Sequence, residues 1–357
     1  MRRLGESPKK KIVFDRMRFF VYEISLVFIL IFLILLIPLF LIPLIVDEGS
    51  ILYGVLFYSL RAVFVFIAIP IVLTLSNIIF ESQERNIIIQ EDISPAVSHL
   101  KLYKMSKKNY KYQILYGILI FFFVFLPIDF FPYLFIPGML EYQGKSIANK
   151  STGSYLVTED YFIFLISAII IQLSVSIAEE TISRGFITIR GSLYFFKMSA
   201  VMVSALYFGL GHFAYFLDPI SRNYPISYPF IMFLQAFIVG IILSLLLLRR
   251  KWIIPAIIAH TLNNIVSAHS VWSYFQGNDF MLITLYLYIP LLIIGIILFI
   301  WQFSRVKESL SIGFNMLKQY FELDETSEQT RGDKIFRVFF DIIIACLIFI
   351  LGIMIAI

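Results

Sequence analysis

Charge is scarce in this sequence. Only 15% of its 357 residues are charged, against roughly 25% in soluble domains, while 60% are hydrophobic and 17% aromatic. A soluble surface around a core of that size is therefore excluded. Apolar runs of about 20 residues, enough to cross a hydrocarbon layer of roughly 30 Å as a helix, recur from Phe19 to Ile357. We predict an all-α polytopic membrane protein without a sizeable soluble domain.

Cysteine is nearly absent as well. The chain has a single cysteine, Cys346, which excludes an internal disulfide and a cysteine-rich metal site. A cleavable signal peptide is not expected either, because the first apolar run, 19–46, is too long and lacks a small-residue cleavage site. No internal repeat stands out, so inverted-repeat transporter architecture has no positive support.

The apolar runs predict about nine membrane-spanning helices. Their expected ranges are 19–46, 52–81, 114–137, 161–182, 196–217, 229–248, 252–270, 280–303 and 336–357. We expect the fourth to seventh helices to form the core of the protein. The division along the chain is then a basic segment 1–18, helices and a basic loop over 19–160, the core over 160–270, and C-terminal helices over 271–357. The connections 82–113 and 304–335 are interpreted as solvated linkers or amphipathic surface helices.

The positive residues indicate the orientation of the protein in the membrane. A net charge of +5 would suggest nucleic acid in a soluble protein, but here Lys and Arg lie between apolar runs. They are concentrated before the first run and in alternate connections, and the intervening connections carry almost none. We predict a plasma-membrane protein with a cytoplasmic N-terminus and a C-terminus on the opposite side. Lipid surrounds it, and no nucleic-acid partner is expected.

Ionisable residues within the apolar runs are expected to have a specific role, since inserting each one at a helix centre costs roughly 2.5 to 3.5 kcal/mol of free energy. Four occur singly and are interpreted as structural or interfacial: Glu23, Arg61, Asp129 and Asp341. His99, in a basic connection, is interpreted as a solvated histidine. Six further polar residues gather on three predicted helices, which is costly for mere packing, and we interpret them as a functional buried site: Glu179, Glu180, Arg184, His212, His260 and Asn264.

Spacing predicts a geometry for this site. Positions four apart share a helix face, so Glu180 and Arg184 are expected to form an ion pair, while Glu179 points about 100° around the axis. The free carboxylate is a candidate general base. His260 and Asn264 are also four apart, and together they are suited to hold a developing oxyanion.

The predicted helices place two residues of this site at different depths in the membrane. Counted from Lys197, His212 lies about 22 Å along its helix, whereas Glu179 is near the cytoplasmic end of the preceding one. We therefore expect the segment between the two helices to extend beyond the bilayer or lie along its surface. Gly209 and Gly211, just before the histidine, are expected to let neighbouring backbone approach closely.

Three motifs occur in order on these helices. Two glutamates followed by three residues and an arginine are read at 179–184, Phe-x-x-x-His at 208–212, and His-x-x-x-Asn at 260–264. In these motifs the chain resembles the CAAX prenyl endopeptidase and bacteriocin-processing family of intramembrane peptidases, also called the abortive-infection domain family. The resemblance covers about residues 160–270, and the remaining helices carry no matching motif.

The resemblance implies an endopeptidase that hydrolyses a peptide bond of a membrane-associated or lipidated protein or peptide, at or within the membrane. In eukaryotic relatives it removes the last three residues of a prenylated protein. On that model Glu179, with His212, activates a water molecule. Glu180 and Arg184 form the supporting pair, and the His-x-x-x-Asn motif stabilises the tetrahedral intermediate.

A metal and two other function classes are left open. His212, His260 and Glu179 are the residue types of a zinc site with an open position, or of a site for another divalent metal. Family members are commonly labelled metalloproteases. The chain has no His-Glu-x-x-His segment, and we favour a metal-free glutamate mechanism. The alternative functions are a proton-coupled transporter and a non-catalytic membrane immunity or scaffold protein.

Overall fold

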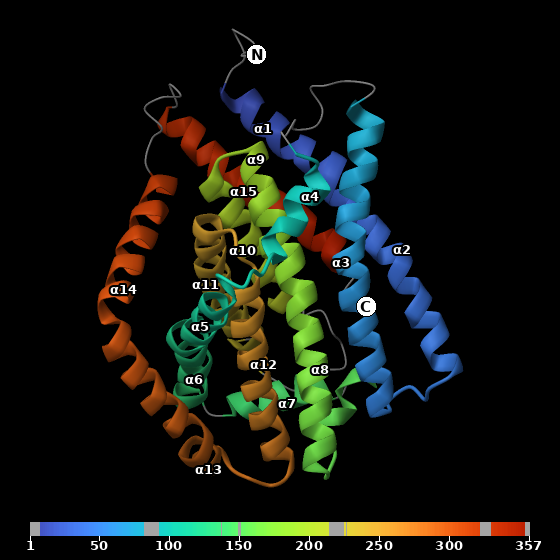
Figure 1. The fold of residues 1–357 in the computed structure, drawn as a ribbon, viewed down its shortest axis with the longest axis vertical. Coiled ribbons are helices and arrows are strands. Elements are labelled where there is room, and N and C mark those ends of the chain that lie inside the picture. Colours follow the sequence, from blue (N-terminus) through green and yellow to red (C-terminus); the bar gives the residue numbers. More distant parts are fainter. Residues whose placement is uncertain are drawn as a thin grey trace.

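The computed structural model describes residues 8–81, 93–136, 138–148, 151–213, 225, 227–321 and 330–353. All regular elements within these ranges are helices. Seven helices are long and apolar enough to cross a membrane: Pro8–Leu44, Ile51–Phe80, Tyr110–Phe135, Tyr161–Tyr194, Ser227–Arg250, Phe280–Phe321 and Arg331–Ile353. The predicted all-α polytopic bundle is confirmed (Figure 1).

Two predicted crossings are present as helices but are not among these seven. They are α10 (Lys197–Phe213) and α12 (Ile254–Phe275). Polar residues such as His260 and Asn264 lower the mean hydropathy of α12. The predicted end of the other helix, up to residue 217, lies outside the described residues. The count of nine therefore stays a prediction.

The helix that carries the paired glutamates is longer than predicted. Instead of ending at 182, α8 (Tyr161–Glu180) continues as the π-helix η6 (Thr181–Arg190) and the short α9 (Gly191–Tyr194). Almost every side chain of η6 is buried, so packing by its neighbours stabilises a helix type that is rare in isolation.

A second helix also runs beyond its predicted end. α14 (Ile289–Phe321) continues 18 residues past position 303, so the solvated-linker interpretation is wrong for 304–321. Residues 322–329 of the same connection lie outside the described part. Four short elements lie in the connections between long helices: α4 (Pro95–Leu100), η3 (Lys101–Tyr103), α7 (Met139–Ala148) and η5 (Ser151–Leu156). Three others belong to the spans themselves: η2 (Ile42–Leu44) ends the first span, and α13 (Phe280–Ile283) and η9 (Thr284–Tyr288) begin the one that α14 continues.

Two apolar cores meet at the α8–η6 helix. One is shared with α2 (Ser25–Leu41), α3 (Ile51–Glu81), α10 and α15 (Arg331–Ile353). The other is shared with α12 and with the continuous helix formed by α5 (Tyr110–Ile120), η4 (Phe121–Phe125) and α6 (Leu126–Phe135). Because α12 packs against both α5 and α8 (Figure 1), its polar stripe faces the end of α8.

Glycine allows α10 and α11 (Ser227–Arg250) to pack closely. A Cβ on Gly240 would lie 2.9 Å from the Cα of Ala205, and one on Gly209 would lie 3.1 Å from the carbonyl oxygen of Phe233. The predicted close approach is therefore present at Gly209. It is absent at Gly211, where an added Cβ would meet nothing within 4 Å among the described residues.

Two of the single charged residues are paired. Glu23, in η1 (Phe20–Ile24), accepts hydrogen bonds from Arg190 Nε and Nη2 at 2.8 and 2.7 Å. Asp341 in α15 accepts one from Arg16 Nε at 2.6 Å, so it joins α15 to α1 (Pro8–Phe19). These buried ion pairs with partners far away in sequence agree with the structural interpretation of Glu23 and Asp341.

His99 is buried rather than solvated. Only 5% of it is exposed, and its ring packs beside Tyr103 with a centroid separation of 5.8 Å. The ring also abuts Gly185, where a Cβ would lie 3.2 Å from the imidazole Cε1. Burial lowers the pKa of His99 to about 4. The solvated interpretation is wrong because α4 folds back onto η6.

Candidate active site

The paired glutamates and His212 lie at the same level of the bundle. Glu179 is 16 residues before Phe195, and His212 is 16 residues after Phe196. The two segments form a helical hairpin whose arms lie side by side. Arg184 Cζ on the first arm lies 4.0 Å from the ring centroid of Phe208 on the second. The predicted mismatch in depth between Glu179 and His212 arose because the helix that carries Glu179 was predicted to end at 182. Where the bilayer lies along the hairpin stays a prediction.

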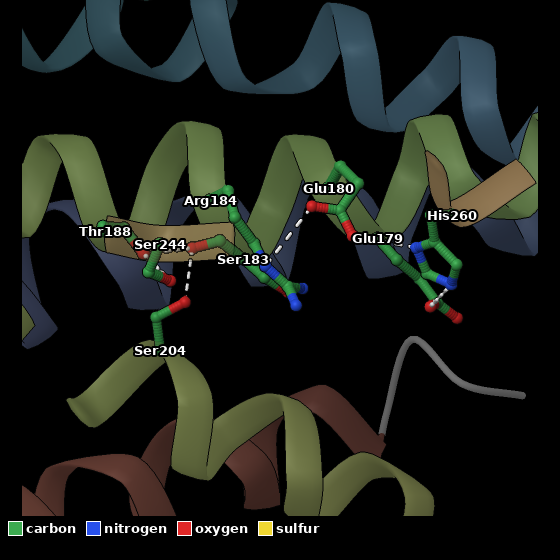
Figure 2. A network of polar contacts seen from close by, with 8 residues as sticks. All are labelled: Glu179, Glu180, Ser183, Arg184, Thr188, Ser204, Ser244 and His260. Atoms are coloured by element: carbon green, nitrogen blue, oxygen red, sulfur yellow. Dashed lines mark hydrogen bonds and ion pairs between the residues drawn. The ribbon is translucent and has the colours of Figure 1, made fainter. Parts of the chain in front are cut away.

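Glu180, the last residue of α8, is completely buried and has two partners. Its Oε1 accepts a hydrogen bond from Nδ1 of His260 at 2.8 Å, and its Oε2 lies 3.3 Å from Nε of Arg184 (Figure 2). The ion pair expected from the spacing is present. The contact with His260 was not predicted, because it joins residues 80 positions apart.

Glu179 has a different environment. Its side chain is 30% exposed, and its Oε2 lies 3.7 Å from Nε2 of His260, which is too long for a hydrogen bond. Figure 2 shows the imidazole with one nitrogen toward Glu180 and the other toward Glu179. The exposed carboxylate is thus beside the buried pair but not part of it.

Aromatic rings hold the imidazole of His260 in place. Phe125 of η4 stacks on it with a centroid separation of 5.6 Å and an angle of 21°, and Phe208 meets it edge-on at 5.9 Å. With the bond to Glu180, these contacts leave the ring little freedom. Phe125 was missed, since nothing in the aromatic run 121–125 distinguishes it in sequence.

Phe208 also contacts His212, with ring centroids 4.9 Å apart. Nδ1 of His212 is 3.0 Å from the Phe208 carbonyl oxygen, so in the tautomer that donates there Nε2 is a free acceptor. The ring is close enough to Glu179 and His260 to interact electrostatically with both. Phe208 is therefore the common neighbour of Arg184 on η6, His212 on α10 and His260 on α12.

Arg184 and Asn264 complete the predicted set. Arg184 is fully buried, and within the described chain its guanidinium nitrogens make no hydrogen bond beyond the ion pair with Glu180. Asn264 is partly buried one turn after His260 on α12. Its side chain has no hydrogen-bond partner among the described residues. The structure thus brings five of the six predicted residues together, through direct contacts or electrostatic interactions. Asn264 lies on the same face of α12 as His260.

Hydroxyl groups hold the π-helix behind the glutamates. The carbonyl oxygen of Ser183 accepts hydrogen bonds from Ser204 of α10 at 2.6 Å and from Thr188 at 3.1 Å (Figure 2). Thr188 also contacts Ser244 of α11 at 3.0 Å. From the other side, the hydroxyl of Tyr103 donates to Thr181 at 2.6 Å. Neighbouring helices and η3 therefore fix the segment that positions Arg184.

The side chains do not fit a three-ligand metal site. Within the described chain, no three His, Cys, Asp or Glu side chains converge as metal ligands. His260 Nδ1 is already used by Glu180, and His260 Nε2 faces Glu179. We therefore derive no step through zinc or another divalent metal at His212, His260 and Glu179.

One comparison with known proteins finds a family. Residues 161–266 match the family described as type II CAAX prenyl endopeptidase, Rce1-like. This segment carries all six residues of the site, and the match agrees with the resemblance seen in the three motifs. It covers less than a third of the 357 residues. No curated protein and no solved structure matches the chain.

Proposed function

We propose that this protein is an intramembrane endopeptidase that hydrolyses a membrane-associated or lipidated protein or peptide with a water molecule activated by Glu179. The family match of residues 161–266 is to CAAX prenyl endopeptidases. The observation that carries the mechanism is the unequal burial of the two glutamates: Glu180 is completely buried and paired, and Glu179 is 30% exposed beside the imidazole.

The proposed reaction begins with a proton transfer from water to the carboxylate of Glu179, assisted by His212. The hydroxide oxygen adds to the carbonyl carbon of the substrate. The oxyanion accepts hydrogen bonds from the Asn264 amide and from Nε2–H of His260, which has to be the doubly protonated imidazolium because its Nδ1–H bonds Glu180. The C–N bond then breaks, and Glu179 returns its proton to the leaving amine. The products are a peptide carboxylate and a peptide amine.

Glu180 and Arg184 act as positioning residues in this proposal. Glu180 binds Nδ1 of His260 at 2.8 Å and so directs Nε2 toward Glu179. Arg184 neutralises Glu180 at 3.3 Å, and its charge also lies over the Phe208 ring. Neither group touches the substrate.

Termini of the membrane proteome test the proposal. Cells carrying wild-type protein are compared with cells carrying Glu179→Ala, and protein termini are mapped by mass spectrometry. We expect at least one membrane protein to keep an uncleaved terminus in the variant. A changed solute or proton flux with unaltered termini would favour a transporter, and full function in Glu179→Gln would favour a scaffold or immunity protein. Either result would overturn the proposal.

A further inference from the structure

Arg61 is an unusual cation of the bundle because it has no anionic partner in the described part of the chain. It is partly buried on α3, its Nε is inaccessible, and that atom has no hydrogen-bond partner. Three of the four buried arginines, Arg16, Arg184 and Arg190, each pair with a carboxylate, and the fourth, Arg337, bonds the carbonyl oxygen of Tyr320. Across the described residues, no carboxylate pairs with Arg61. A guanidinium held inside a membrane-spanning bundle without a partner is costly, so a ligand is the natural source of the missing anion.

The side chain faces the interior of the bundle. Val65, Ala68 and Ile69, which are four, seven and eight positions after Arg61, are fully buried and pack in the core that includes Ala178. Residues at these spacings share one face of a helix. Arg61 therefore begins the stripe of α3 that packs toward the end of α8, away from lipid.

Arg61 also lies near the height of the glutamates. The hydroxyl of Tyr58 contacts Thr152, shortly before α8 begins, and Phe66 packs at 4.9 Å on Tyr103, whose hydroxyl bonds Thr181 at the end of α8. The two helices thus run in the same direction, as Figure 1 shows. Arg61 is five residues, about 7.5 Å, before Phe66 along this axis.

Tyr207 of α10 lies near both this cation and the site. Tyr207 of α10, five residues before His212, interacts electrostatically with both Arg61 and Glu179. Arg61 on α3 and the exposed carboxylate on α8 are therefore both near one tyrosine. Arg61 lies outside residues 161–266, so the family match assigns it no role.

From this placement, and resting on the proposed peptidase function, we infer that Arg61 binds the C-terminal carboxylate of the peptide substrate and so directs cleavage to a bond near that end. A guanidinium can bind a carboxylate through two parallel hydrogen bonds. The C-terminal carboxylate is the one anion that every linear peptide with a free C-terminus carries near its last peptide bonds. A lipid phosphate fits less well, because Arg61 is ten residues, about 15 Å, from the start of α3.

The test compares two forms of one peptide on the purified full chain. The probe is an S-prenylated peptide that ends in cysteine, two aliphatic residues and methionine, made as the free acid and as the C-terminal amide. We expect the wild type to cleave the acid about 10-fold to 100-fold faster than the amide. Arg61→Gln should cleave both at the slower rate, and Arg61→Lys should keep part of the preference.

The ratio of acid to amide cleavage within one preparation is independent of how much protein is folded. Arg305→Gln, which removes a charge on α14 away from the site, is the matched control and should keep the wild-type ratio. Equal cleavage of both forms by the wild type, or an unchanged ratio in Arg61→Gln, would overturn the carboxylate role and leave the peptidase standing. A wild type that cleaves neither form would overturn both proposals.

Discussion

At the scale of single residues, Glu180 is expected to stabilise the fold and Glu179 to support catalysis. Substitution of Glu180 by Gln leaves the fully buried Arg184 unpaired, so we expect Glu180→Gln to destabilise the protein by about 3 to 5 kcal/mol. Glu179→Gln removes a partly exposed group and should change stability little while activity falls about 10²-fold to 10⁴-fold. Thermal unfolding in detergent and peptide cleavage measure the two effects. Equal destabilisation by both variants would contradict this division.

The buried His99 makes stability depend on pH. Its pKa falls from the ordinary 6.5 to about 4 in the folded protein, so the unfolded chain binds the proton more readily. Stability is then lost as the pH falls from about 6.5 toward 4, by at most about 3 kcal/mol for the difference of about 2.5 units. Unfolding of wild type and His99→Gln at pH 7 and pH 5 measures it. The wild type should lose more stability than the variant, and parallel losses would refute the assignment to His99.

A metal-free reaction predicts resistance to chelators. Since no set of three ligands converges among the described side chains, we expect cleavage by the purified protein to survive prolonged treatment with EDTA at an unchanged rate. Catalysis in this proposal depends on Glu179 and the imidazole of His260 instead. Loss of activity that zinc restores, with no restoration by magnesium, would show that substrate or metal rearranges these side chains into a zinc site.

Spacing along one helix was enough to predict part of the site. The Glu180–Arg184 ion pair and the separate direction of Glu179 follow from positions on a single helix. The bond from His260 to Glu180 and the stacking of Phe125 depend on how distant helices pack, which periodicity does not contain. His99 was misinterpreted for the same reason, because its burial comes from contacts with a segment far along the chain.

At the scale of helices, the contact between α10 and α11 depends on small residues. A methyl group added at Gly240 would lie 2.9 Å from the Cα of Ala205, so Gly240→Ala should destabilise the protein by about 1 to 3 kcal/mol. Gly313→Ala on α14 is the control, because its added methyl meets nothing within 4 Å of the described residues. Thermal unfolding compares them, and an equally small effect of both would show that the two helices can separate at little cost.

Helix existence was easier to predict than helix extent. The apolar runs placed each long helix, but the polar segment after Glu180 was expected to leave the helix at 182. It continues to Tyr194 because α3, α4, α10 and α11 bury its side chains, and part of it is a π-helix that hydropathy does not distinguish from an α-helix. α14 also continues past 303, although apolarity falls there and most of its side chains beyond that position are not buried.

At the scale of the whole molecule, the distribution of Lys and Arg predicts one orientation in the membrane. In a Cys346→Ser background, Lys107→Cys should react with a membrane-impermeant maleimide in inverted vesicles and Glu159→Cys in right-side-out vesicles. Both positions are exposed in the structure. The seven apolar helices support an integral membrane protein and do not decide its direction. The opposite labelling pattern would reverse the predicted topology.

The equal arms of the hairpin make the interval between Glu179 and His212 a fixed length. Adding one residue within α10 before Phe208 would turn the rest of that helix by about 100° and shift it by about 1.5 Å relative to the first arm. Phe208 would then no longer meet Arg184. Loops elsewhere can change in size during evolution, whereas we expect the two helical arms within this interval of 33 positions to tolerate no single-residue insertion or deletion.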